Sequence, residues 1–223
     1  MKLNTIMIIK NVFVFLSIMM LTSCTLFSPV NLETKKYVID KIPTNIPKEQ
    51  THAVTLLILP PETKAIYNTT QMAYTTQPYK IAYFSQNEWG ETPAKMIQPL
   101  IVKTLQNTHY FNTIVTPPYS RHYTYVLRTQ ILELLQDYTS QPAMLRLSIR
   151  FQLSDGSDNQ VIGSKELTVN EPLSTNTPYA GVIAANQATA KILHDELQNL
   201  FQSIILKNKV MPQCSTHMNK YQE

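Results

Sequence analysis

One cysteine near the start of the chain stands where its thiol could undergo covalent modification. Cys24 follows an apolar run that has Lys2 and Lys10 before it and ends at Leu21. A short cationic segment, an apolar stretch of roughly ten residues and a small-residue end are typical of an export signal. A membrane-spanning helix needs about twenty apolar residues, and the polar residues around Cys24 come too early for one. Residues 1–23 are therefore predicted to be a signal peptide.

The four residues that end at Cys24, Leu-Thr-Ser-Cys, resemble a bacterial lipobox. In that motif the cysteine sulfur takes a diacylglycerol, the signal peptide is cut off before the cysteine, and the new amine is acylated, for example with palmitate. We therefore predict Cys24 as the lipid attachment site of a membrane-anchored lipoprotein. The alternative is an ordinary secretory signal with a chance cysteine. With Cys24 lipidated, Cys214 is the only thiol left, so no internal disulfide can form.

The rest of the chain lacks a residue pattern typical of catalysis or metal binding. The five histidines are dispersed, and none has a cysteine or carboxylate at a spacing suited to a metal. The sequence contains no G-x-S-x-G motif, and its four glycines are too scattered for a phosphate-binding loop. We therefore predict that the chain is not an enzyme, with no catalytic, cofactor-binding or metal-binding residues and no cofactor apart from the lipid on Cys24.

Three side chains are candidates for contact with a partner or with lipid headgroups: Trp89, Arg146 and Arg150. The two arginines share one face of an alternating segment. They could reach anionic headgroups, or they could line the outer side of a sheet and pair with Glu166. Trp89 either covers the core where a helix begins or anchors a partner from an exposed position. The net charge of +4 comes from scattered residues, which do not form the basic stripe typical of nucleic-acid binding.

These residues must be positioned by a single domain, because the chain without its signal peptide is long enough for one well-buried domain and short for two. Residues 24–50 contain prolines and lysines with little periodicity, and they are predicted to be a flexible tether. Residues 51–206 carry the periodic segments and are predicted to be the folded domain. Residues 207–223 are polar and are predicted to be a disordered tail.

The periodic segments predict an α+β fold. Two helices are expected to begin at Thr-Pro pairs, with threonine as N-cap and proline at the first helical position, over 93–107 and 178–206. Strands are expected over 54–59, 72–74, 80–84, 110–115, 123–135, 145–153 and 161–169. The two strands at 72–84 are expected to form a hairpin or an edge arm, and a turn at Asp155-Gly156 is expected to join the last two strands. The prediction is a mainly antiparallel sheet of about five to six strands with two helices packed on it.

Several short segments, taken in order, resemble those of a known family. They are the lipobox, Leu57-Ile58-Leu59-Pro60, Met72-Ala73-Tyr74, Ile81-Ala82-Tyr83, the segment from Asn87 to Pro93, and the segment from Val182 to Thr189. Together they resemble the ABC-type transport auxiliary lipoproteins, a PqiC-like family that accompanies MCE-type lipid transport systems. Around Trp89 the match is partial, because Asn-Glu precedes this residue and Gly-Glu-Thr-Pro follows it.

The resemblance implies a non-enzymatic component that helps phospholipid or other hydrophobic cargo pass between inner and outer membranes, while a separate ATPase hydrolyses ATP. The implied partners are the membrane through the lipid anchor, an MCE-domain protein and an ABC permease with its ATPase. The resemblance also allows a homo-oligomer, and it implies no nucleic acid. Thr25 after the cysteine, in place of Asp, favours the inner leaflet of the outer membrane, facing the periplasm. The alternative is a structural lipoprotein of envelope assembly or of a secretion system.

Overall fold

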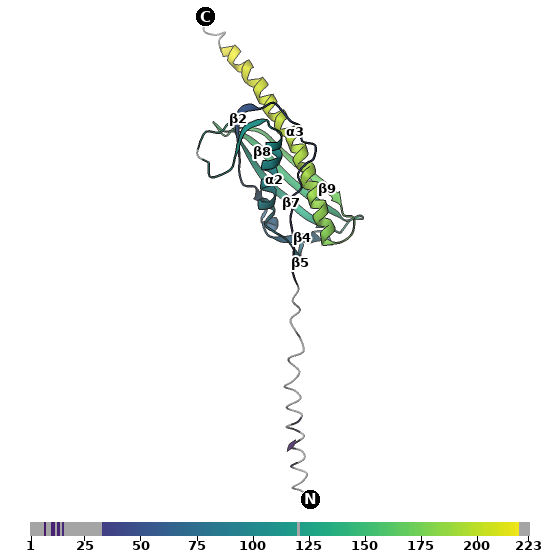
Figure 1. Ribbon diagram of the computed structural model, residues 1–223. Coiled ribbons are helices and arrows are strands. Elements are labelled where there is room, and N and C mark those ends of the chain that lie inside the picture. The colour runs from purple at the N-terminus through teal and green to yellow at the C-terminus, as the bar shows by residue number, and fades with distance from the viewer. Residues whose placement is uncertain are drawn as a thin grey trace. The chain divides into compact units, whose positions relative to one another are not determined.

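The computed structural model describes residues 33–119 and 121–218 and, before them, the single residues 7, 10, 11, 13 and 15. The chain divides into two compact units, Met1–Glu33 and Thr34–Glu223, and the second contains the folded domain (Figure 1). Cys24 lies outside the described residues, so its lipidation stays a prediction. No helix in the described part of the chain is both long and apolar enough to cross a membrane.

The domain is built on one sheet whose central member is strand β7 (Tyr125–Asp137). Strand β8 (Met144–Asp155) pairs antiparallel with β7, and β9 (Val161–Pro172) pairs antiparallel with β8. These are the three long strands that the alternation of apolar and polar residues predicted. The predicted turn at Asp155-Gly156 joins β8 to β9. This part of the prediction is confirmed, because strict alternation is a local signal of a half-buried strand.

The other edge of β7 is shared by three short strands that follow one another along it, all parallel to β7. Strand β2 pairs with the start of β7, β3 with its middle and β4 with its end. Beyond them, β6 pairs parallel with β2, β5 pairs antiparallel with β4, and β1 pairs parallel with β5. Their bounds are β1 (Lys35–Tyr37), β2 (His52–Ile58), β3 (Glu62–Thr63), β4 (Gln71–Thr75), β5 (Ala82–Trp89) and β6 (Phe111–Val115).

The sheet is mixed, so the prediction of a mainly antiparallel sheet of five to six strands is wrong. Within the described residues it has nine strands, and five of its eight pairings are parallel. The hairpin of β4 and β5 is confirmed, because its partners are close in sequence. Parallel partners need a long crossover, and the hairpin and helix α2 (Pro93–Asn107) lie between β2 and β6. The sequences of the short strands do not indicate which distant strand each one pairs with.

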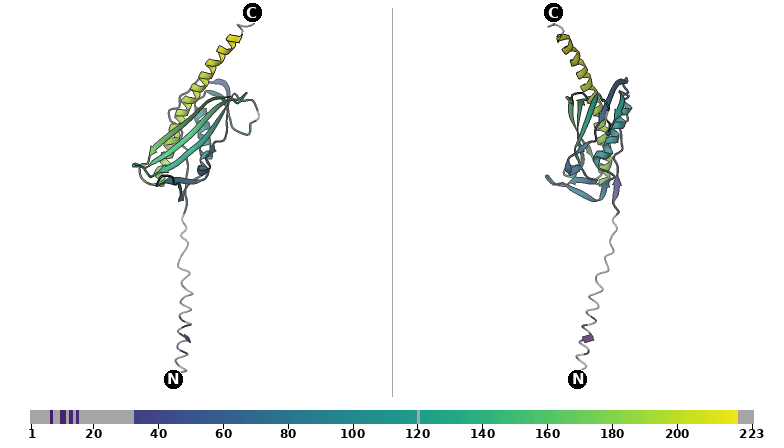
Figure 2. Two further views of the ribbon diagram at one scale, coloured as in Figure 1. Left: turned by 180° about the vertical axis from the view of Figure 1, so that it is seen from behind. Right: turned by 90° about the vertical axis from the view of Figure 1, so that its left-hand side faces the viewer.

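Both predicted helices are present and lie on the same face of the sheet (Figures 1 and 2). Helix α2 and helix α3 (Pro178–Met218) each begin at the predicted proline. At the start of α3, the backbone N–H of Ala180 donates to Thr177 Oγ1 at 3.3 Å, as expected of an N-cap. Helix α3 continues past the end predicted at Leu206. The prediction ended it where the apolar stripe ends, and residues 207–218, predicted as part of a disordered tail, are helical instead.

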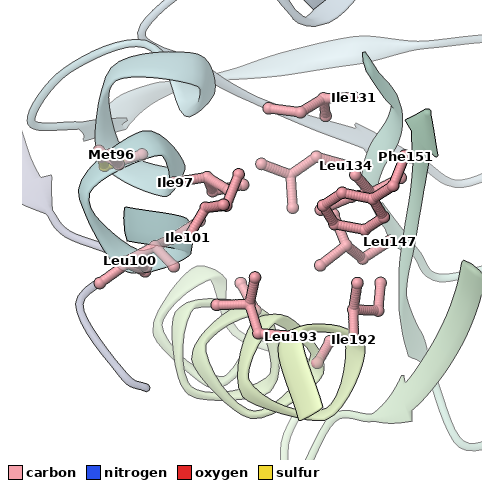
Figure 3. Packing of buried hydrophobic residues seen from close by; sticks show 14 of the residues in the cluster. Met96, Ile97, Leu100, Ile101, Ile131, Leu134, Leu147, Phe151, Ile192 and Leu193 are labelled. Atoms are coloured by element: carbon pink, nitrogen blue, oxygen red, sulfur yellow. The ribbon is translucent and has the colours of Figure 1, made fainter. Parts of the chain in front are cut away.

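Apolar side chains from both helices and from the inner face of the sheet form the main core. Ile97 of α2 and Ile192 of α3 face Leu147 and Phe151 of β8 (Figure 3), and each is at most 1 % exposed. Full burial of one such side chain contributes about 1.5–3 kcal/mol. Gly181 allows α3 to approach the sheet closely, because a Cβ at this position would overlap the side-chain amide of Gln136 in β7.

The start of the predicted tether belongs to the domain, so the prediction of a flexible tether over 24–50 is wrong for residues 34–50. Strand β1 pairs with β5, and Ile39 is 2 % exposed within the main core. Sequence reasoning missed this packing because the segment has no periodicity. A few buried side chains and hydrogen bonds to distant residues hold it in place.

The side chain of Asn186 in α3 fastens this segment to the domain. Its Oδ1 accepts hydrogen bonds from the backbone N–H groups of Asp40 (2.9 Å) and Lys41 (3.1 Å). Its Nδ2 donates to the carbonyl oxygen of Val38 at 3.0 Å. We call residues 38–41 the strap. One amide side chain thus makes three hydrogen bonds to the strap, which orders the chain just after it enters the domain.

Candidate functional site

The face of β7, β8 and β9 that points away from the helices carries rows of polar side chains. In β8 these side chains alternate with the core residues, and the pairing register places each beside residues of β7 and β9. Arg150 lies between Gln130 and Glu166, and Ser148 lies between Glu133 and Thr168. We call this surface the charged face; its residues are Gln130, Glu133, Asp137, Arg146, Ser148, Arg150, Glu166 and Thr168.

A β-bulge in β7 determines which residues reach the charged face. The pairing shifts between Ile131 and Glu133, so Glu133 lies opposite Ser148 and Leu132 is buried. Strict alternation after Ile131 would instead turn Leu132 and Leu134 outward and bury Glu133. Sequence reasoning did not single out Glu133, since the residue types alone do not mark the bulge.

Arg146 connects two carboxylates of β7. Its Nε and Nη2 donate to Glu133 Oε1 at 3.1 and 2.5 Å, and its Nη1 donates to Asp137 Oδ2 at 3.1 Å. Burial opposes ionisation of the guanidinium, but the hydrogen bond and charge of Glu133 outweigh burial and raise the pKa of Arg146. Burial would likewise raise the pKa of Asp137, yet hydrogen bonds from Thr139 and the charge of Arg146 hold it below its usual value. Arg146 and Asp137 are therefore both ionised at neutral pH.

Arg150 pairs across the strands with Glu166, the partner that one interpretation of the sequence named. Its Nη2 donates to Glu166 Oε2 at 2.8 Å, and its Nη1 donates to Gln130 Oε1 at 3.2 Å. The hydrogen bond from Arg150 is the main cause that lowers the pKa of Glu166. The side chains of Arg150 and Glu166 are each 46 % exposed. Both can therefore contact a partner while they remain paired with each other.

A groove of about 540 Å³ lies beside these rows, with Lys64, Ile66 and Tyr67 on its other side. Burial, with a smaller contribution from the charge of Glu133, raises the pKa of Tyr67 to about 12, so its hydroxyl stays protonated. The groove therefore offers the Tyr67 hydroxyl together with two cations, Lys64 and Arg150, and the carboxylates of Glu133 and Glu166, whose charges compensate one another. This arrangement suits hydrogen bonding to the polar surface of another protein.

A larger groove of about 720 Å³ lies between residues 41–45 and helix α3. The Lys191–Glu171 ion pair, with 2.5 Å between Nζ and Oε2, belongs to its lining. His194 and Asp195 also line it. Charges of both signs are mixed along this groove, and its lining does not indicate one ligand class.

Of the three predicted contact residues, the structure places Arg146 and Arg150 on the charged face and Trp89 in the core. Trp89 ends β5 and is only 3 % exposed. Its interpretation as a residue that covers the core is confirmed, and its interpretation as an exposed partner contact is wrong. Within the ranges that the structure describes, no three His, Cys, Asp or Glu side chains are placed to hold a metal ion.

One residue of the sequence, Asn186, is a sign of the strap that its local pattern does not explain. Asn186 stands in the middle of a helix among alanines, and an amide there has poor intrinsic helix propensity. Its position is explained by its hydrogen bonds to the strap, which no local pattern reveals.

A model of one protein family, described as the ABC-type transport auxiliary lipoprotein component, matches residues 37–195. This stretch runs from the last residue of β1 into α3, so it includes the strap, the charged face and α2. The chain belongs to this family. The resemblance that the short segments indicated is therefore confirmed. Membership makes the chain an auxiliary lipoprotein component of ABC-type transport.

Two solved structures share the fold of this auxiliary lipoprotein. A Xanthomonas campestris protein of the family DUF330 has a TM-score of 0.69 and 15 % identity, with 78 % of this chain and 99 % of the other covered. An uncharacterized protein has a TM-score of 0.62 and 10 % identity, with 75 % and 99 % covered. At these identities the likeness shows the fold alone. No curated protein matches the chain in sequence.

Proposed function

We propose that this auxiliary lipoprotein is a non-enzymatic part of an ABC-type, MCE-linked system that moves phospholipid between the inner and outer membranes. The observation that carries the proposal is the family match over residues 37–195. The lipobox at Cys24 supports a diacylglycerol anchor with an acylated amine. Such an anchor would hold the domain at the inner leaflet of the outer membrane, facing the periplasm.

In this proposal the domain acts by binding an MCE-domain protein and the permease with its ATPase. The anchor raises the effective concentration of the domain beside these partners. The charged face is our candidate for the binding surface, because Arg150 and Glu166 are half exposed and held in a defined geometry by cross-strand pairs. Ordered charges at an interface mainly provide specificity and orientation.

The anchor is tested by the variant Cys24→Ala. We expect an uncut precursor that takes up no labelled palmitate, because the sulfur that carries the diacylglycerol is missing. Palmitate labelling of the variant equal to that of the parent would overturn the assignment of Cys24.

The partners are tested by purification of a tagged chain from cross-linked envelopes. We expect an MCE-domain protein and an ABC permease to copurify with it. Recovery of outer-membrane scaffold or secretion proteins, without transport subunits, would favour the structural lipoprotein and overturn the transport role.

The binding surface is tested by exchanging the two charges, in the double variant Arg150→Glu with Glu166→Arg. The internal ion pair is retained, so the fold should remain, while a partner would meet reversed charges. We expect about a tenfold loss of copurified partner with an unchanged melting temperature. The control is Lys103→Glu, an exposed charge on α2, which should leave recovery unchanged. Equal recovery for the exchanged pair and the parent would exclude the charged face as the binding surface.

A further inference from the structure

An exposed apolar patch lies where the chain enters the folded domain. It consists of Tyr37, Val38, Tyr179 and Ile183, and we call it the proximal patch. Val38, Tyr179 and Ile183 are 54 %, 58 % and 41 % exposed. The rings of Tyr37 and Tyr179 lie 5.8 Å apart. Tyr179 and Ile183 share one face of α3, because residues four apart on a helix are neighbours. Clustered exposed apolar side chains of this kind mark contact sites for membranes or proteins.

The proximal patch is held in place by hydrogen bonds. The carbonyl oxygen of Val38 accepts from Asn186, which stands three residues after Ile183 on α3. The carbonyl oxygen of Tyr37 accepts from the backbone N–H of Gly90 at 2.6 Å, and the Tyr37 hydroxyl donates to Asn87 Oδ1 at 3.2 Å. The strap and β1 therefore fix two members of the patch against the start of α3. A prearranged surface loses little conformational entropy when it binds.

The length of the connecting chain indicates what covers this patch. The folded unit begins at Thr34, so only residues 25–33 separate it from Cys24. The ten Cα–Cα steps from Cys24 to Thr34 span at most about 36 Å when fully extended. Tyr37 follows three residues after Thr34, so the proximal patch contains some of the first residues of the folded unit after the anchor, and a short chain connects it to the lipid surface. The predicted longer tether, to residue 50, would have allowed the domain to stand farther away.

The composition of the patch suits the boundary between lipid and water. A tyrosine ring has an apolar body and a hydroxyl that stays hydrated, and tyrosine is enriched at membrane interfaces. The charges next to the patch have both signs, since Lys35, Lys36 and Lys41 are accompanied by Glu33 and Asp40. Binding should therefore depend on apolar contact and respond little to salt.

We propose that the proximal patch docks on the surface of the membrane that holds the lipid of Cys24. The inference rests on the proposed anchor and adds a second contact that sets how the domain is oriented. Strands β4 and β5 and the start of α3 lie at one end of the domain, away from the end beyond which α3 extends (Figures 1 and 2). Docking at the patch directs the opposite end, where β9 begins, away from the lipid.

The experiment uses the mature lipidated chain in vesicles of phosphatidylethanolamine and phosphatidylglycerol, with or without brominated acyl chains that quench tryptophan. The probe is Tyr179→Trp. The control is Val161→Trp, because Val161 is 51 % exposed at the start of β9. Strand geometry places it on the order of 35 Å from the patch end of β9. The signal of buried Trp89 is subtracted with the parent chain.

We expect brominated lipid to quench the tryptophan at 179 at least about twofold more than the one at 161, because only the patch reaches the acyl region. The further change Ile183→Asp in the 179 variant should reduce its quenching to the level at 161, with an unchanged circular dichroism spectrum.

Equal quenching at the two positions, in vesicles that retain the chain, would overturn the docking and leave the anchor intact. A blue shift at 179 that grows with protein density, without quenching by bromine, would show that another protein copy covers the patch, which also overturns it. A chain that does not stay with the vesicles would overturn the anchor, and the docking with it.

Discussion

The two faces of the β7–β8–β9 sheet are made by the same strands but held by different forces. On the inner face, side chains such as Leu147 and Phe151 are at most 1 % exposed against the helices. On the outer face, the side chains of Arg146 and Arg150 are 40 % and 46 % exposed and paired with carboxylates. Apolar burial stabilises by about 1.5–3 kcal/mol per large side chain, whereas exposed ion pairs contribute about 0–1 kcal/mol. The inner face therefore supplies stability, and the outer face can change with little effect on the fold.

The largest expected effect is on the inner face. Phe151→Ala should lower the free energy of unfolding by about 3–5 kcal/mol, because it leaves a cavity between the sheet and α3. Its neighbour Gln152 points to the outer side, and Gln152→Ala should cost less than about 0.5 kcal/mol. Urea denaturation of both variants measures the difference. Similar losses in the two variants would contradict the contrast between the faces.

Two buried carboxyl groups interrupt the apolar inner side: Glu171, which pairs with Lys191 of α3, and Glu196. Glu196 of α3 is 7 % exposed and lines a cavity of about 160 Å³ with Lys165 and Ser203. Its Oε2 has no hydrogen-bond partner among the residues described. Burial raises the pKa of Glu196 from an ordinary 4.5 to about 8, although the charge of Lys165 opposes the shift. A raised pKa in the folded state means that stability is full below about pH 4.5 and falls as the pH rises through about 8.

Glu196→Gln should therefore match the parent at pH 4 and exceed its unfolding free energy by roughly 5 kcal/mol at pH 9. Denaturation across this pH range measures the effect. On the charged face, Glu166→Gln should instead lower the unfolding free energy at neutral pH. The reason is that the pKa of Glu166 is lowered, so its ionised form stabilises the fold. Parallel pH curves for the parent and Glu196→Gln would show that this carboxyl is not buried.

A smaller loss of unfolding free energy is expected where the strap is hydrogen-bonded to Asn186 of α3. Asn186→Ala removes three hydrogen bonds to the strap and should cost about 1–2 kcal/mol. Amide hydrogen exchange should increase in residues 38–41 before it does so in the sheet. The control is Asn199→Ala on the same helix, whose Nδ2 donates only to the nearby carbonyl oxygen of Asp195 in the described contacts. Unchanged exchange in the strap would contradict the role of Asn186.

The smallest effect is expected on the outer face. Arg146→Ala should cost about 0.5–1 kcal/mol, because the pair with Glu133 and Asp137 is only partly shielded from water. The loss should shrink as salt screens the pair, which distinguishes it from the salt-independent loss at Phe151. Thermal unfolding at low and high salt measures the losses of stability in Arg146→Ala and in Phe151→Ala. A loss as large as that of Phe151→Ala would show that the outer face is also part of the stabilising core.

Sequence reasoning predicted the elements whose signals are local. The alternation in β8, the hairpin of β4 and β5 and the proline starts of both helices were all correctly placed, since each depends on residues near one another. Of the candidate site, the Arg150–Glu166 pair was foreseen as one alternative. The contributions of Glu133 and Asn186 were not, because the first depends on a bulge and the second on a segment far away in sequence.

The sequence by itself determined the element types, the apolar stripe of each helix and the alternating faces of β8, and it predicts a lipobox at Cys24. These follow from residue spacing, which repeats every two residues in strands and every 3.6 in helices. Only the tertiary structure decided the parallel partners of β7, the packing of residues 34–50 and the burial of Trp89. The physical reason is that these features depend on contacts between distant segments, whose free energies no single segment contains.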